Sequence, residues 1–217
     1  MNNAPFTIAD KRPIRAGMTV SRPAQLGQEV PVTWFSMGAG TSITPESYDC
    51  ATLYLGAEGH GDFLLGMNGQ HVSMSPGKLL LVSPGTLCGT QTGDGLIYTE
   101  IILKKENYTM NNLIKAGHPT ELKDLISYEE GSIANLDIVH ADNMKFVLMA
   151  FDEGTGLTPH RAPGNAILTA LEGKAIIGYE GQDYELKAGE SFRFDKEGLH
   201  SVTPQGKFKM SLLLIIE

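Results

Sequence analysis

Two segments decide the fold of this chain: residues 17–59, GMTVSRPAQLGQEVPVTWFSMGAGTSITPESYDCATLYLGAEG, and residues 131–173, GSIANLDIVHADNMKFVLMAFDEGTGLTPHRAPGNAILTALEG. They align without a gap at a constant offset of 114, which places Thr44-Pro45 on Thr158-Pro159. After a short insertion in the first copy, the match resumes at an offset of 112. This period is too long for a solenoid, whose units span a few tens of residues. The repeat therefore predicts two copies of one small globular domain.

The composition is that of a globular protein with an acidic surface. The net charge is −8 over 217 residues, and the sequence contains no cluster of Lys and Arg. Nucleic acids and anionic membranes need a basic patch, so we expect neither as a partner. The first residues show no charged segment followed by an apolar run, and the longest aliphatic stretch, 212–216, is too short to span a bilayer. Two cysteines, Cys50 and Cys88, do not make a disulfide framework, so a reduced, cytoplasmic protein is expected.

Short strands are predicted along most of the chain. Residues 145–151, 166–171 and 174–179 are apolar or alternating runs separated by glycine or charged turns. Glu172-Gly173 and Glu180-Gly181 are predicted to be tight hairpin turns, because glycine readily adopts the positive φ that such turns require. Many short strands at even spacing indicate an all-β sandwich or barrel, and the first copy repeats the scheme.

The repeat also predicts the domain boundaries. We expect an N-terminal arm over residues 1–16, a first barrel over 17–104, a connector over 105–130 and a second barrel over 131–217. The arm is expected either to pair as an edge strand or to be disordered. In the connector, the spacing of apolar residues after a potential N-cap threonine predicts a short helix over 120–126.

Several motifs in the second copy resemble those of the cupin superfamily. They are Gly156-Leu157-Thr158-Pro159-His160, Leu171-Glu172-Gly173, Leu186-Lys187-Ala188-Gly189-Glu190 and Gly198-Leu199-His200. With two copies in tandem, the chain resembles a bicupin of the small bacterial cupin-2 type. The resemblance implies a jelly-roll β-barrel for each copy, with a ligand pocket between its sheets, and the repeat predicts that the two barrels pack side by side. Because cupins often pair through sheet edges, it also implies a homodimer or a closely packed bicupin monomer.

The same resemblance implies candidate metal ligands, of which half are replaced here. Metal-binding cupins hold a divalent ion with three His and one Glu, and His160 and His200 stand at two of the His positions. Ala162 and Ala166 occupy the positions of the other His and the Glu, and Asn165 lies beside the latter. Two imidazoles alone hold an ion weakly, and a neutral amide oxygen is a poor replacement for a carboxylate. The pair is therefore interpreted as ligands of Fe, Mn, Ni or Zn, or as pocket histidines that bind a small molecule.

The first copy has lost both histidines. Glu46 stands at the position of His160, Tyr48 at that of Ala162, and Cys88 at that of His200. A carboxylate and a thiol could ligate an ion or perform acid–base chemistry. The alternative is that this copy has drifted into a packing role, with Cys88 as a small buried hydrophobe.

Two functions of different classes remain open on the sequence. One is a metal-dependent isomerase, lyase or dioxygenase acting on a small polar or carbonyl-bearing metabolite, with the ion at His160 and His200. The other is a non-catalytic cupin that binds a small molecule without a stable metal. The remaining histidines, which are His60, His71, His118 and His140, are predicted to be exposed to solvent.

Overall fold

The computed structural model describes residues 4–104 and 107–217, and nearly all of its regular structure is β-strand. Residues 1–3 of the predicted arm and 105–106 of the predicted connector lie outside the described residues. Two compact units are formed. An N-terminal unit comprises Ile8–Tyr108 and Asn112–Glu121, and a C-terminal unit comprises Leu122–Glu217, Thr109–Asn111 and the described residues up to Thr7.

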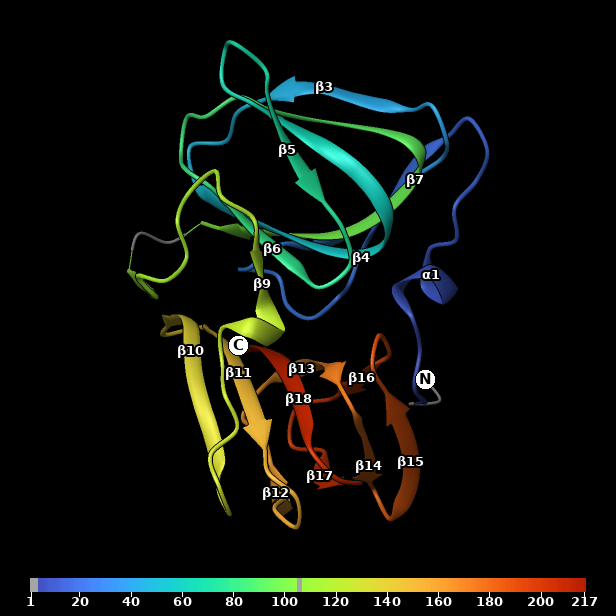
Figure 1. Ribbon diagram of the computed structural model, residues 1–217. Coiled ribbons are helices and arrows are strands. Elements are labelled where there is room, and N and C mark those ends of the chain that lie inside the picture. The colour runs from blue at the N-terminus through green and yellow to red at the C-terminus, as the bar shows by residue number, and fades with distance from the viewer. Residues whose placement is uncertain (1–3, 105–106) are drawn as a thin grey trace. The chain divides into compact units, whose positions relative to one another are not determined.

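The N-terminal unit is built on one strongly bent antiparallel sheet (Figure 1). Its strands follow the order β1-β2-β7-β4-β6-β9, with β3 paired to β7 and β5 paired to β4. The elements are α1 (Ile8–Lys11), β1 (Thr19–Pro23), β2 (Val32–Met37), β3 (Ser42–Glu46), β4 (Ala51–Leu65), β5 (Gln70–Met74), β6 (Lys78–Val82), β7 (Cys88–Leu103) and β9 (Thr120–Glu121).

The two long strands β4 and β7 give this unit its interior. They pair along most of their length, with irregularities at Gly56/Glu58 and His60/Asp62 that allow the strands to bend. A Cβ at Gly59 would lie 2.1 Å from the carbonyl oxygen of Gly95, so the tight crossing at this bend requires glycine. The concave face of the sheet carries a cluster of buried side chains that includes Tyr54, Phe63 and Tyr98.

The C-terminal unit consists of two antiparallel sheets. The six-stranded sheet has the order β16-β13-β18-β11-β10-β8, and the four-stranded sheet has the order β12-β17-β14-β15. The elements are β8 (Tyr108–Met110), the 3-10 helix η1 (Leu122–Asp124), β10 (Ile133–Ala141), β11 (Met144–Phe151), β12 (Leu157–Arg161), β13 (Asn165–Glu172), β14 (Lys174–Tyr179), β15 (Gln182–Lys187), β16 (Ser191–Phe194), β17 (Leu199–Pro204) and β18 (Phe208–Ile215).

Alternate residues of these strands fill the space between the two sheets. The buried cluster includes Phe192, Phe194, Leu168 and Ile177, with Met149 and Met210 as further core residues. Period-two alternation places every second side chain on the inner face, which is why the apolar pattern of the sequence predicts this core.

One turn differs from its prediction. Glu180-Gly181 connects β14 to its hairpin partner β15, as expected. Glu172-Gly173 instead carries the chain from the six-stranded sheet to the four-stranded sheet, because β13 and β14 lie in different sheets. Gly173 has φ +77°, and an added Cβ would lie 2.2 Å from the carbonyl oxygen of Lys207. The glycine is thus needed for a corner between sheets and not for a hairpin.

The connector contains less helix than the sequence pattern predicts. Thr120–Glu121 pairs with β6 as strand β9, and only Leu122–Asp124 forms a single 3-10 turn. The apolar spacing correctly indicates burial, since Leu122 and Ile126 are both buried. Seven residues form too few hydrogen bonds to offset helix nucleation, so tertiary pairing decides their conformation.

The described part of the N-terminal arm combines a short helix with a single bridge. The helix is α1, which contacts β4 and β7 of the N-terminal unit. Within the C-terminal unit, Phe6 forms an isolated antiparallel bridge with Ser191. No helix among the described residues has the length and hydrophobicity to cross a membrane.

Candidate functional site

His160 and His200 face each other across two strands of the four-stranded sheet. His160 lies on β12 and His200 on β17, and the two residues are direct partners in the antiparallel register. Residues opposite each other in such a pair project from the same face of the sheet. Their ring centroids are 4.3 Å apart, with an interplanar angle of 53°. The structure therefore brings together the two histidines that the sequence placed 40 residues apart.

The two rings sit at different depths. His200 is buried, with 6% of its surface exposed, and it stacks on Phe194 of the opposite sheet at a centroid distance of 4.1 Å. His160 is exposed. The pair therefore joins an imidazole at the surface to one that packs in the space between the sheets.

Both rings are oriented by the same kind of hydrogen bond. Nδ1 of His160 lies 2.8 Å from the carbonyl oxygen of Thr158, and Nδ1 of His200 lies 2.9 Å from that of Gly198. A carbonyl oxygen only accepts, so each Nδ1 carries the hydrogen and donates it. In the neutral form, each Nε2 then presents a lone pair. Burial lowers the pKa of His200, the backbone carbonyl of Gly198 opposes that shift, and the neighbouring His160 lowers it further. His200 is therefore held neutral at pH 7.

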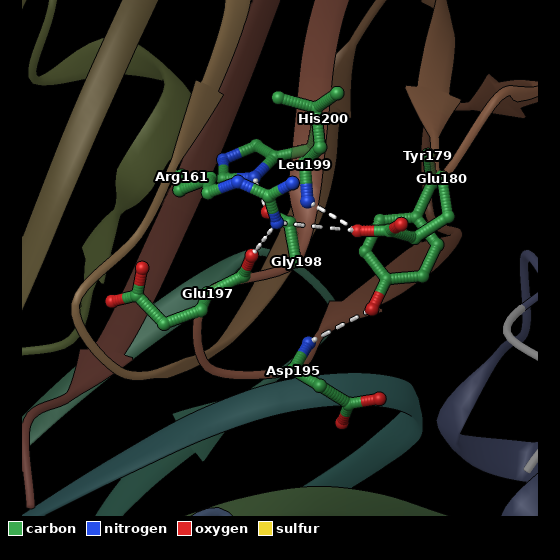
Figure 2. Close-up of polar contacts among 8 residues, drawn as sticks. All are labelled: Arg161, Tyr179, Glu180, Asp195, Glu197, Gly198, Leu199 and His200. Carbon is green, nitrogen blue, oxygen red and sulfur yellow. Dashed lines mark hydrogen bonds and ion pairs between the residues drawn. The ribbon is translucent and has the colours of Figure 1, made fainter.

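Tyr179 is a third member of this row and was missed by the sequence analysis. It lies on β14 and is the direct register partner of His200 on the side away from His160. The side chain is 9% exposed and packs its ring against Phe192 and Phe194. Its hydroxyl accepts a hydrogen bond of 3.4 Å from the backbone N–H of Asp195 (Figure 2). The alternating pattern of 174–179 could have placed Tyr179 on the inner face, but without the pairing register nothing linked it to the histidines.

Hydrogen bonds and an ion pair fix the loop that precedes His200. Arg161 donates to the carbonyl oxygen of Glu197 and forms an ion pair with Glu180 (Figure 2), with 3.7 Å between Nη1 of Arg161 and Oε1 of Glu180. The same carboxylate of Glu180 accepts from the backbone N–H of Leu199 at 2.6 Å. Asn165 belongs to this framework, because its Oδ1 accepts from the backbone N–H of Lys196 at 3.0 Å. The amide oxygen that the sequence offered as a pocket group is therefore engaged in positioning the loop.

The residues around the histidine pair do not complete a metal site. Ala166 is buried and Ala162 is partly buried, and neither methyl group can ligate an ion. Among residues 4–104 and 107–217, no three His, Cys, Asp or Glu side chains are grouped so that they could hold a metal ion. Stable protein sites for transition metals supply three or four ligands, so two imidazoles do not fit a resident ion.

The N-terminal unit repeats the same register with different residues. Glu46 on β3 is the direct partner of Cys88 on β7, as His160 is of His200. Tyr48 interacts with both Glu46 and Cys88, so the three candidates of the first copy do lie together. Burial raises the pKa of the Cys88 thiol to about 11, an effect that a hydrogen bond with Tyr54 partly opposes and the charge of Glu100 increases. Cys88 is consequently a thiol at neutral pH, which disfavours a role as nucleophile or metal ligand.

The sequence analysis also missed Glu100, the most deeply buried carboxylate of this group. Only 7% of its surface is exposed, and its register partner across β4 and β7 is Tyr54. Burial raises the pKa of Glu100, whereas hydrogen bonds with Tyr54 and Tyr48 lower it and the charge of Glu46 raises it. Glu100 escaped notice because it stands within the apolar run of β7, where the pattern indicates only a buried strand.

The remaining histidines are exposed, as predicted, and two of them contact aspartates. His71 lies 3.1 Å from Asp62, and His140 lies 3.6 Å from Asp137. His60 and His118 are exposed as well.

Comparison with known proteins agrees with this architecture. Residues 147–216 match the family model Cupin_2, described as a cupin domain. A cupin 2 conserved barrel domain protein from Leptotrichia buccalis is similar in structure, with a TM-score of 0.83 and 24% identity over 97% of this chain and 95% of that chain. Salicylate 1,2-dioxygenase from Pseudoaminobacter salicylatoxidans, solved with gentisate, has a TM-score of 0.67 and 12% identity over 98% of this chain and 81% of that chain.

A third structure, the putative glyoxylate induced protein from Pseudomonas aeruginosa, has a TM-score of 0.60 and 17% identity over 91% of this chain and 79% of that chain. No curated protein matches the sequence. The all-β jelly-roll fold is thereby confirmed, and the match to a cupin domain lies in the C-terminal unit.

Proposed function

We propose that the C-terminal barrel binds a small polar molecule through the row formed by His160, His200 and Tyr179. The observation that carries this proposal is the matched orientation of the two imidazoles, whose Nδ1 atoms both donate to backbone carbonyls. Each Nε2 is then an acceptor for a hydroxyl or N–H group of a ligand. The hydroxyl of Tyr179 accepts from Asp195 and keeps its own hydrogen for a ligand carbonyl. The row therefore suits a hydroxylated or carbonyl-bearing metabolite.

The proposed pocket works without a stable metal. A metal-dependent isomerase, lyase or dioxygenase would need further ligands, and Ala162 and Ala166 occupy the positions where the family resemblance implies them. Neutral His200, stacked on Phe194 and held by Gly198, is suited to accepting a hydrogen bond. We therefore infer a binding function for this barrel.

Two measurements test this function. Elemental analysis of protein from cells grown with added iron, manganese, nickel and zinc should find well below one equivalent of each. A library of small hydroxylated and carbonyl compounds is then screened by NMR, with His160→Ala and His200→Ala as test variants. His140→Ala, an exposed histidine of the same unit, is the matched control. A hit should weaken in both test variants and persist in the control.

Two outcomes would contradict the proposed binding function. One equivalent of metal in the wild type that is lost in His160→Ala and in His200→Ala would replace this proposal with a metal centre. Hits that bind all three variants equally would place the ligand elsewhere.

We further propose that the chain is a bicupin, with an N-terminal barrel over 17–104 and a C-terminal barrel over 131–217. The equivalent register of Glu46/Cys88 and His160/His200 supports this organisation. A cytoplasmic location and either a homodimer or a closely packed bicupin monomer remain our predictions, and light scattering of the purified protein tests which of the two forms. A mass larger than that of a dimer would contradict both.

A further inference from the structure

One pair of facing strand positions is polar in the N-terminal barrel and apolar in the C-terminal barrel. Tyr54 pairs with Glu100 across β4 and β7. At the repeat offsets of 114 and 112, the equivalent pair across β13 and β18 is Leu168 with Leu212. The same two backbone positions therefore carry a hydrogen-bonded phenol and carboxyl in one copy and two leucines in the other. A packing role alone does not require this exchange, because the leucine pair fills the equivalent position.

Polar side chains around Glu100 extend from the surface to the interior. Glu46 is exposed, Tyr48 is 36% exposed, Glu100 is 7% exposed and Tyr54 is 4% exposed. Tyr48 and Tyr54 both hydrogen-bond with Glu100. A carboxylate can accept about four hydrogen bonds, so two phenols leave part of its capacity for a further donor.

Thr52 is a second, independent indication that a ligand contact is missing from this interior. It precedes Tyr54 by two residues on β4, so its side chain projects from the same face, and its register partner on β7 is Ile102, two residues beyond Glu100. The residue is 1% exposed, and its Oγ1 has no hydrogen-bond partner within the described part of the chain. A buried hydroxyl without a partner destabilises the folded state, so natural structures rarely keep one without a reason.

The charge around Glu100 selects the kind of ligand. Within the described residues, the titratable groups that act on Glu100 are Glu46, Tyr54 and Tyr48, and none of them is basic. Glu100 in turn acts on Cys88 and Tyr98, which are also acidic groups. An anionic ligand would add repulsion to a site that already disfavours its own carboxylate, whereas a cation would relieve both the desolvation of Glu100 and its repulsion by Glu46.

We propose that the interior of the N-terminal barrel is a second small-molecule site, which binds a small protonated amine through Glu100, with Thr52 as a further polar contact and Tyr48 at the entrance. The ammonium group donates up to three hydrogen bonds, to the carboxylate of Glu100 and to the free Oγ1 of Thr52. The rings of Tyr54 and Tyr48 beside the carboxylate add cation–π attraction. This site has a chemistry opposite to that of the neutral acceptor pair in the C-terminal barrel, and it does not depend on the function proposed for that barrel.

Three probes of the same shape test the proposal: n-propylamine, propionate and 1-propanol. Each is titrated into the full-length protein, and the backbone amides of β4 and β7 are followed by NMR. Propylamine should give saturable shifts with a millimolar Kd, and propionate should give none. Glu100→Gln keeps the shape and removes the charge, so it should weaken propylamine by at least about tenfold. His140→Ala, at an exposed histidine of the other unit, should leave propylamine binding unchanged.

The pH dependence provides a readout that a structural role of Glu100 would not give. The amine binds the ionised carboxylate, so its affinity in the wild type should rise as pH increases from 4.5 and Glu100 loses its proton. The dependence should be lost in Glu100→Gln. No saturable amine binding, equal binding to Glu100→Gln, or equal binding of 1-propanol would each overturn the proposal.

Discussion

Removing one partner of the Tyr54–Glu100 pair should cost more stability than removing both. Tyr54→Phe deletes only the hydroxyl and leaves Glu100, which is 7% exposed, one donor short. A buried acceptor that loses its partner costs about 1–3 kcal/mol, and more when it is charged. Glu100→Leu places the leucine of the C-terminal barrel at the equivalent position and leaves the Tyr54 hydroxyl without this partner, for a loss of about 1–2 kcal/mol. The double variant removes both polar groups.

The double variant should therefore be less destabilised than the sum of the two single variants, by about 1–3 kcal/mol. Urea denaturation of all four proteins at pH 7, followed by circular dichroism and fitted with a common m-value, measures this coupling energy. The cycle Leu168→Ala with Tyr54→Phe is the control, because these residues lie in different units and their effects should add. Additive losses for Tyr54→Phe and Glu100→Leu would refute the hydrogen-bonded pair as the stabilising unit.

The sign of the pH dependence gives a second check on the same pair. The folded-state pKa of Glu100 is raised, chiefly by burial, above its ordinary value of 4.5. The folded protein therefore holds this proton more tightly than the unfolded chain does. The associated stability is complete below pH 4.5 and is lost as pH rises through the folded-state pKa. Replacing Glu100 should thus cost less at pH 7 than at pH 4, and a cost that grows with pH would contradict the raised pKa.

Two further predictions concern the C-terminal barrel. Burial lowers the pKa of His200 from 6.5, so the stability of the wild type should fall as pH drops below 6.5. His200→Phe keeps the stack on Phe194 and should reduce this fall, as measured by urea denaturation at pH 5 and pH 7. An unchanged difference between the two pH values would contradict the prediction. A Cβ at Gly164 would lie 1.9 Å from the carbonyl oxygen of Ile215, so Gly164→Ala should lose about 1–3 kcal/mol in the same assay, whereas Gly93→Ala, with open space, should lose less than about 1 kcal/mol.

The sequence predicts which site residues are equivalent in the two copies better than it predicts which polar residues are buried. The repeat, with offsets of 114 and then 112, fixes which residues are equivalent, and the two pairs His160/His200 and Glu46/Cys88 indeed occupy equivalent register positions. Glu100 and Tyr54 could not be found in this way, because they stand in apolar runs whose pattern indicates burial without saying what a buried polar group contacts. Only the pairing of β4 with β7 shows that they face each other.

Polar strands were the weakest part of the sequence prediction. Strands β12 (LTPHR) and β17 (LHSVTP) carry the two histidines but show no apolar run. Their conformation is imposed by pairing with neighbouring strands, since β propensity depends strongly on context. A site on such strands is visible in the sequence through the repeat and the family resemblance, and hardly through strand propensity.

The two barrels carry their polar groups on different strands of the same fold, and these groups change the stability of the chain with pH in opposite directions. In the C-terminal barrel the polar row lies on the four-stranded sheet and Leu168/Leu212 lie on the opposite one. In the N-terminal barrel Tyr54/Glu100 replace those leucines. The neutral His200 makes stability fall toward acid, and the raised pKa of Glu100 makes it fall toward base from pH 4.5. The contributions have opposite slopes and belong to separate units, so a flat wild-type profile can hide both. In His200→Phe, the remaining Glu100 should make stability fall as pH rises from 4.5. In Glu100→Leu, the remaining His200 should make stability fall as pH drops below 6.5.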